Sequence, residues 1–273
     1  MFMKKEFCIV TPLHKKSINE YEKNCLIRIN DNFKVIDKFL ITFEENNLDE
    51  VTSNLIKNYK RVNLSKSWFE SIYTYNMLSC SIEFYDKFKN YKYILICHLD
   101  ALVLSSNIQK FIDLNYSFIG APTAKKSPFD RSRKKLWKLK YFCNGGFSLR
   151  KVDDFLSVLN SENIRFPFNK FTIKEIFKSG FFKFLILYIK TFFHKKNKKG
   201  LYFSNNLYVH EDTFWSYFAT LFHDNFKLPD KEDCLKFAFD GNPDFYYKEN
   251  NFQLPLAFHG YHNYIKFLDK IKK

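Results

Sequence analysis

One apolar run, KYILICHLDALVL at residues 92–104, constrains the fold more than any other segment. Its nearly continuous hydrophobicity is expected of an interior parallel strand that is covered on both faces. Weaker runs predict strands at 7–12, 35–43 and 61–64, while the apolar spacing over 68–88 predicts a helix with a broad buried face. Strands that alternate with helices predict an α/β fold with a mixed, mainly parallel sheet flanked by helices.

The size of the chain and its composition limit the kind of protein further. A single α/β domain accommodates 273 residues, so we expect one domain over 1–273. A hydrophobic content of 46% excludes a disordered chain. The run of Ser and Asn at 105–107 is expected to cap a helix that ends near Leu114.

The net charge of +15 favours polyanionic partners, which include nucleic acids, anionic lipids and phosphorylated substrates. A basic nucleic-acid-binding protein is therefore one alternative. The aromatic residues lie mainly in core-like runs, and the sequence contains no zinc-finger or RNP motif. We therefore expect no nucleic-acid partner.

The cysteines and the first residues suggest a compartment. Six cysteines are present without a C-x-x-C pair, which argues against a structural zinc site. Cys8 and Cys97 lie in apolar runs, where cysteine usually behaves as a small buried hydrophobe. The N-terminal residues lead directly into a predicted strand and lack the pattern of a secretory signal. These features predict a reducing, cytoplasmic location.

Residues 170–200 differ from the rest, because aromatic and lysine residues alternate there and a basic tail follows at 194–199. The segment predicts a helical insertion, and its lysines argue against a membrane-spanning helix. One interpretation is a helix that lies on an anionic membrane surface, which would place the protein at the inner face of the cell membrane. The other is an ordinary core helix with a solvated lysine tail.

The first polar cluster interrupts the apolar run at His98 and Asp100. A carboxylate is costly to bury without a partner. At the carboxyl end of an interior strand it would point toward the crevice where α/β folds bind ligands, and a divalent cation is a natural partner there. The alternative is that Asp100 accepts hydrogen bonds from nearby backbone amides.

Small residues mark a second cluster. Gly120 follows a predicted strand, and Asn144, Gly145 and Gly146 precede another. Glycines let a backbone approach a ligand closely, and Asn144 could bind hydroxyl groups. A plain turn is the alternative, and the sequence G-x-x-x-x-G-K of a phosphate-binding loop is absent.

Two further clusters lie toward the C-terminus. Glu211 and Asp212 come at the predicted start of a helix, where acids are stabilised by the helix dipole, or where one of them could act as a general base. His259 follows an apolar run and precedes a glycine. It could bind a metal or a phosphate, or simply be packed. Basic residues over 131–140 could cover a diphosphate or form a solvated loop.

Five motifs in this order resemble a family of GT-A-like glycosyltransferases that is linked to bacterial surface polysaccharides. The motifs are HLDALVL (98–104), FIGAP (118–122), NGGFSLRK (144–151), HEDTFWS (210–216) and LAFHG (256–260). The resemblance covers roughly residues 90–265 and implies a GT-A-like, Rossmann-like fold.

The resemblance also implies roles for the candidate residues. Asp100 corresponds to the surviving acid of an Asp-x-Asp motif, with His98 at the position two residues before it. Asp100 and His259 would hold Mg²⁺ or Mn²⁺. The substrate-binding residues would be His98, Gly120, Asn144, Gly145 and Gly146, and the catalytic residues would be Asp212, as base, and Glu211.

These expectations predict a glycosyltransferase that moves a sugar from a nucleotide-diphosphate donor to a hydroxyl of a glycan or lipid-linked glycan, with inversion. A catalytically inactive GT-A-like module that binds glycans or acts as a scaffold is an alternative. A glycosidase that uses Asp100 and Asp212 as paired carboxylates is another.

Overall fold

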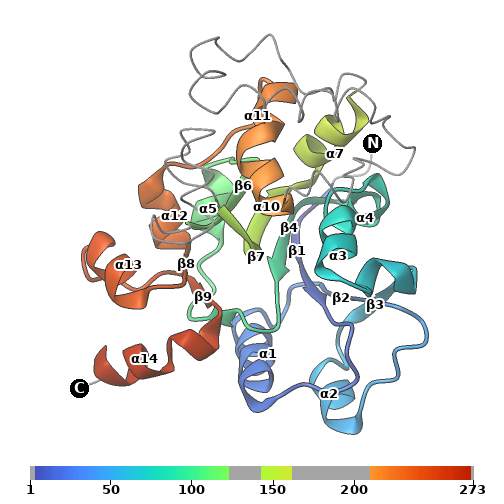
Figure 1. Cartoon of the computed structure of the whole chain (residues 1–273), viewed down its shortest axis with the longest axis horizontal. Coiled ribbons are helices and arrows are strands. Elements are labelled where there is room, and N and C mark those ends of the chain that lie inside the picture. Colours follow the sequence, from blue (N-terminus) through green and yellow to red (C-terminus); the bar gives the residue numbers. More distant parts are fainter. Residues whose placement is uncertain (1–3, 123–142, 162–209, 272–273) are drawn as a thin grey trace, which may run out of the picture.

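The computed structural model describes residues 4–122, 143–161 and 210–271. It confirms a mixed α/β fold in which a mainly parallel sheet lies at the centre and helices lie around it (Figure 1). The strand order of this sheet is β3-β2-β1-β4-β7-β6. Neighbours from β3 to β4 are parallel, whereas β7 is antiparallel to both β4 and β6.

Two groups of strands are present in the described residues. The larger sheet contains β1 (Lys5–Pro12), β2 (Lys38–Thr42), β3 (Lys60–Asn63), β4 (Tyr91–Cys97), β6 (Phe118–Pro122) and β7 (Cys143–Lys151). The smaller sheet contains β5 (Leu102–Val103), β8 (Ala238–Asp240) and β9 (Ala257–His259), in the order β5-β9-β8.

The helices of the described residues are short. They are α1 (Glu20–Asn32), α2 (Glu50–Leu55), α3 (Ile72–Leu78), α4 (Ile82–Asp86), α5 (Gln109–Asp113), α7 (Val152–Asn160), α10 (Glu211–Thr213), α11 (Ala219–Phe222), α12 (Lys231–Phe237), α13 (Pro243–Glu249) and α14 (Ile265–Ile271). The 3₁₀ turns Lys66–Phe69 and Tyr261–Asn263 and the π-helical turn Phe214–Phe218 connect some of them.

Alternate residues of β4 belong to two different hydrophobic cores, which is why its sequence is apolar throughout. Ile94 and Ile96 pack in one core with residues of α3, α4 and α7. Leu95 and Cys97 pack in the other with residues of α1 and α5. The prediction of an interior strand is therefore confirmed.

The length predicted for that strand is wrong. The run over 92–104 is divided into β4 and β5, which belong to different sheets, and a turn at residues 98–101 separates them. The break falls where the polar side chains interrupt the apolar pattern. His98 and Asp100 thus lie between two strands rather than inside one.

Several other boundaries also differ from the prediction. The helix predicted over 68–88 is divided into the 3₁₀ turn, α3 and α4, and Ser71 and Ser81 cap the two α-helices. The strand predicted from Val35 begins only at Lys38, and Val35 itself is exposed. The side chains of residues 105–107 do not cap α5, whose N-cap is Ile108. Local hydrogen bonds from serine thus divide a pattern that hydrophobicity alone reads as continuous.

All six cysteines lie in the described part of the chain and all are buried free thiols, as predicted for Cys8 and Cys97. The predicted insertion at 170–200 and the basic segment at 131–140 lie outside the described residues. Among the described helices, none is long and apolar enough to cross a bilayer.

Candidate active site

The turn that follows β4 holds His98 and Asp100 at the carboxyl edge of the sheet. The backbone N–H of His98 donates to the carbonyl of Gly146 on β7 at 2.8 Å, and that of Tyr261 donates to the carbonyl of Asp100 at 2.9 Å. These bonds tie the turn to β7 and to the end of β9. The backbone at Asp100 is thus hydrogen-bonded, while its side chain is 39% exposed.

His259, the last residue of β9, completes a group with that turn. His98, Asp100 and His259 each offer a ligand atom, and these atoms lie within 4.8 Å of one another. Oδ1 of Asp100 lies 3.5 Å from Nε2 of His259. The rings of His98 and His259 have centroids 5.8 Å apart. The tertiary structure therefore brings the two predicted metal ligands together and adds His98, which we expected to contact substrate.

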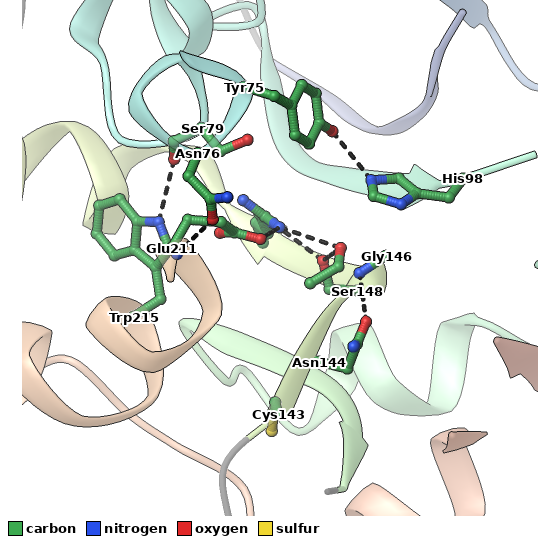
Figure 2. A network of polar contacts seen from close by, with 12 residues as sticks. Tyr75, Asn76, Ser79, His98, Cys143, Asn144, Gly146, Ser148, Glu211 and Trp215 are labelled. Carbon is green, nitrogen blue, oxygen red and sulfur yellow. Dashed lines mark hydrogen bonds and ion pairs between the residues drawn. The ribbon is translucent and has the colours of Figure 1, made fainter. Parts of the chain in front are cut away.

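Each histidine ring also has a hydrogen-bond partner outside this group. Nδ1 of His259 lies 3.2 Å from Oδ1 of Asp240, the last residue of β8. Nε2 of His98 is hydrogen-bonded to the hydroxyl of Tyr75 at 3.0 Å, as Figure 2 shows. Both rings are thus held from outside the group that they form with Asp100.

The two imidazoles have opposite pKa shifts. Burial and, to a smaller extent, the neighbouring His259 lower the pKa of His98 to about 3, although the charge of Asp100 acts to raise it. Burial also acts to lower the pKa of His259, but the hydrogen bond and charge of Asp240 and the charges of Asp100 and Asp212 outweigh it, so that pKa is raised. Carboxylates therefore dominate the field around His259, although the chain as a whole carries +15.

The paired glycines lie within β7 rather than in a turn. Among the described glycines only Gly241 and Gly260 have positive φ, so neither Gly145 nor Gly146 needs a left-handed backbone. A Cβ on Gly145 would overlap the carboxylate of Glu211, and one on Gly146 would overlap the imidazole of His259. The glycines thus make room for the side chains of two other motifs.

A register shift between β6 and β7 accompanies this arrangement, because Gly120 pairs with Ser148 whereas Pro122 pairs with Cys143. Gly120 is buried, and a Cβ there would overlap the carbonyl of Asn144. Oδ1 of Asn144 accepts from the N–H of Gly146 at 2.7 Å. Bulged strands commonly redirect residues beside active sites. A substrate-binding role for these residues stays a prediction.

On the other side of Gly145, Glu211 forms a buried ion pair with Arg150 of β7. Nη2 of Arg150 and Oε1 of Glu211 are 3.0 Å apart, and the two side chains are 2% and 9% exposed. Arg150 also donates to the hydroxyl groups of Tyr85 and Ser148 and to the carbonyl of Gly145. Figure 2 shows Glu211 within this network.

Helix α10 begins at Glu211, as predicted, and Glu211 and Asp212 occupy its first turn. The N–H of Glu211 donates to Oδ1 of Asn76 at 2.7 Å, and Nε1 of Trp215 donates to the carbonyl of Ser79 at 3.1 Å. Burial raises the pKa of Glu211, and Arg150 opposes that shift. Oε2 of Glu211 is buried without a hydrogen-bond partner among the described residues.

Asp212 differs from its neighbour in exposure, because Glu211 is buried whereas Asp212 is only partly so. Its charge contributes to the raised pKa of His259, so the two residues lie within electrostatic range of each other. The acid after β4, the late histidine and the acidic helix start therefore converge on one region, around Gly145 and Gly146.

Sequence reasoning missed Arg150, Tyr75 and Asp240. Arg150 is part of the NGGFSLRK motif, but nothing local indicates that an arginine is buried. Asp240 did have a detectable signal, because Ala238–Gly241 (AFDG) repeats the pattern of Ala257–Gly260 (AFHG). The hydroxyl of Tyr75 comes from a helix distant in sequence and left no signal.

The donor set suits a transition-metal ion better than Mg²⁺. Imidazole nitrogen is a common ligand of first-row transition-metal ions such as Fe²⁺ and Zn²⁺, whereas Mg²⁺ prefers oxygen ligands and several waters. Two imidazoles and one carboxylate, surrounded by further carboxylates, fit a divalent cation of this kind.

A family model described as "Protein of unknown function (DUF5672)" matches residues 58–259, and the chain therefore belongs to this family. The matched range contains all of the candidate site residues named above. No curated protein matches the sequence.

The chain is similar in fold to several solved structures of glycosyltransferases. One is the galactosyltransferase LgtC in complex with donor and acceptor sugar analogues, at 12% identity over 92% of this chain and 86% of that chain, with a TM-score of 0.48. Another is the apo form of the bifunctional glycosyltransferase WbbM, at 12% identity over 93% and 45%, with a TM-score of 0.45. A third is core-mannan synthase A (CmsA/Ktr4) from Aspergillus fumigatus in its Mn/GDP form, at 12% identity over 56% and 61%, with a TM-score of 0.37.

Proposed function

We propose that the protein is a nucleotide-sugar-dependent glycosyltransferase that transfers a sugar to a hydroxyl of a glycan or lipid-linked glycan. One observation carries the proposal. His98, Asp100 and His259 form a group that could hold a cation at the carboxyl edge of the sheet, Glu211 lies against the neighbouring Gly145, and Asp212 lies within electrostatic range of His259. Open α/β sheets bind ligands at this edge.

The proposed metal is a divalent cation, Mn²⁺ in preference to Mg²⁺, held by Asp100, His259 and His98. When bound, such a cation neutralises the charge that develops on a leaving diphosphate. The residues around it already supply a site of the right sign, because Asp240 and Asp212 add negative charge close to His259.

In the proposed reaction Asp212 is the general base. The acceptor hydroxyl oxygen forms a bond to the anomeric carbon while the bond from that carbon to the diphosphate oxygen breaks, and the hydroxyl proton passes to the Asp212 carboxylate. This displacement inverts the configuration. Glu211 supports the base, because its ion pair with Arg150 and its N–H bond to Asn76 fix the first residue of α10.

An acceptor anchored in an anionic membrane is a further part of the proposal. It depends on residues 170–200, which lie outside the described part of the chain. Deletion of residues 174–199 is expected to reduce binding to vesicles that contain phosphatidylglycerol, and unchanged binding would contradict a membrane role.

Nucleotide binding gives the first test. Thermal unfolding with UDP, GDP, ADP and CDP, each with and without Mn²⁺, is expected to identify a diphosphate that raises Tm only when the metal is present. Equal Tm values in every mixture would contradict the proposal.

Asp212→Asn gives the second test, with the donor that carries the selected diphosphate. The base contributes about 10²–10⁴-fold, so transfer is expected to fall by that factor while nucleotide binding persists. Asp224→Asn, an exposed acid after α11, is the matched control and should leave transfer unchanged. Nucleotide binding without transfer in the wild type would favour the inactive glycan-binding alternative.

A further inference from the structure

The strands β8 and β9 consist of matched tripeptides. Ala238, Phe239 and Asp240 pair in parallel register with Ala257, Phe258 and His259. A glycine follows each strand, and both glycines have positive φ, 96° at Gly241 and 72° at Gly260. A non-glycine residue rarely adopts such a conformation, so each strand is built to stop directly after its polar residue.

The matched ends place Asp240 beside His259 and on the opposite side of the ring from Asp100. Oδ1 of Asp240 is 3.2 Å from Nδ1 of His259, whereas Oδ1 of Asp100 is 3.5 Å from Nε2. The backbone register fixes the first contact, because Asp240 and His259 are direct strand partners. The aromatic rings of Phe239 and Phe258, whose centroids are 5.8 Å apart, pack against each other and hold the two strand ends together.

We propose that Asp240 is the positioning residue for the cation site: it accepts a hydrogen bond from Nδ1–H of His259 and so directs the Nε2 lone pair toward Asp100 and the cation. This inference rests on the proposed function for its metal. A carboxylate behind a metal-binding histidine fixes the ring orientation and the tautomer, and it increases the electron density of the ligating nitrogen.

The packing around His259 makes orientation matter. A Cβ on Gly146 would overlap the His259 ring, so that side of the ring is enclosed by the backbone of β7. The His259 side chain is only 15% exposed. Within this space Asp240 is the residue bonded to Nδ1, so its loss would leave the tautomer and the ring angle unspecified.

Removal of the carboxylate tests the inference through metal affinity. Loss of such a partner costs about 10–100-fold in metal affinity. Asp240→Ala is therefore expected to raise the Kd for Mn²⁺ by at least about 10-fold, measured from the electron paramagnetic resonance signal of free Mn²⁺. Asp240→Asn keeps an acceptor oxygen and should show a smaller increase. Asp244→Asn, an exposed acid on α13 paired with Lys270, is the control and should match the wild type.

The tautomer gives a second readout that does not need metal or activity. In metal-free protein the imidazole ¹⁵N resonances of His259 should show one protonated Nδ1 and one unprotonated Nε2 in the neutral form. In Asp240→Ala the two resonances should move toward averaged values, while those of His98, which contacts Tyr75, stay in place.

The outcomes separate this inference from the proposed function. Folded Asp240→Ala protein that binds Mn²⁺ as tightly as the wild type would overturn the role of Asp240, even if sugar transfer were established. A wild type that binds no Mn²⁺ would overturn it as well. The transfer assay would then test the proposed glycosyltransferase activity separately. Weakened Mn²⁺ binding in Asp240→Ala, in a protein without transfer activity, would support the positioning role and reject the enzyme.

Discussion

Two groups of charged side chains lie against adjacent glycines of β7, and they balance their charges differently. Against Gly145, Glu211 and Arg150 form a pair that is almost completely buried and bonded to Tyr85 and Ser148. Against Gly146, the largely buried His259 lies between carboxylates that leave a surplus of negative charge. The first group is internally neutral, whereas the second has an excess of negative charge, which suits the proposed cation.

This difference separates a structural role from a binding role. The burial of an ion pair carries a large desolvation penalty, so its two charged groups need each other and further hydrogen bonds within the protein. A group that keeps contact with solvent can exchange a proton or an ion. We therefore expect changes at the Arg150 pair to lower stability first, and changes at His259 to lower metal binding first.

The largest expected effect is that of Arg150→Met. It leaves the Glu211 carboxylate buried without its cation, so the free energy of unfolding should fall by about 3–5 kcal/mol. Urea denaturation followed by circular dichroism measures the change. Lys270→Ala, which removes an exposed ion pair with Asp244, is the control and should cost less than about 1 kcal/mol.

A second substitution sharpens that test. Glu211→Gln in the Arg150→Met background removes the unpaired charge, so part of the lost stability should return. Equal costs for Arg150→Met and Lys270→Ala would contradict the structural role assigned to the buried pair.

The two glycines give the most direct test of the comparison. Gly145→Ala inserts a methyl group into the buried pair, and such overpacking typically costs about 1–3 kcal/mol of stability. Gly146→Ala presses on the His259 ring, which can shift toward solvent, so it should weaken Mn²⁺ binding with a smaller loss of stability. Urea denaturation and Mn²⁺ titration of both variants measure these effects. A larger loss of stability in Gly146→Ala, together with weaker Mn²⁺ binding in Gly145→Ala, would contradict the distinction between the two groups.

The smallest expected effect is a pH dependence of the metal-free protein. Hydrogen bonding and nearby carboxylates outweigh burial and raise the folded pKa of His259 above its ordinary value of 6.5. Its contribution to stability is complete below that value and is lost as the pH rises through the folded pKa. Tm in EDTA from about pH 6 to about pH 9 should therefore fall more steeply for the wild type than for His259→Asn. Parallel curves would contradict the raised pKa.

Sequence patterns alone were enough to predict the class of fold and most positions of the candidate site. The apolar run at 92–104 identified the central strand, because only a strand covered on both faces needs such continuous hydrophobicity. Asp100, His259 and the pair Glu211–Asp212 were identified because charged or titratable groups beside apolar runs are costly without a function or a partner. The start of helix α10 was predictable, since acids are stabilised in a first turn.

Only the tertiary structure decided which partner each of these groups has. Gly145 and Gly146 suggested a close approach to a ligand, yet the space beside them is filled by Glu211 and His259. Arg150 meets Glu211, 61 residues away, and Asp240 meets His259 through strand register. A charged residue beside an apolar run shows in the local sequence, because its burial is costly without a partner. The partner that offsets this cost comes from a segment distant in the chain. Strand pairing and packing set that contact, and no local pattern encodes it.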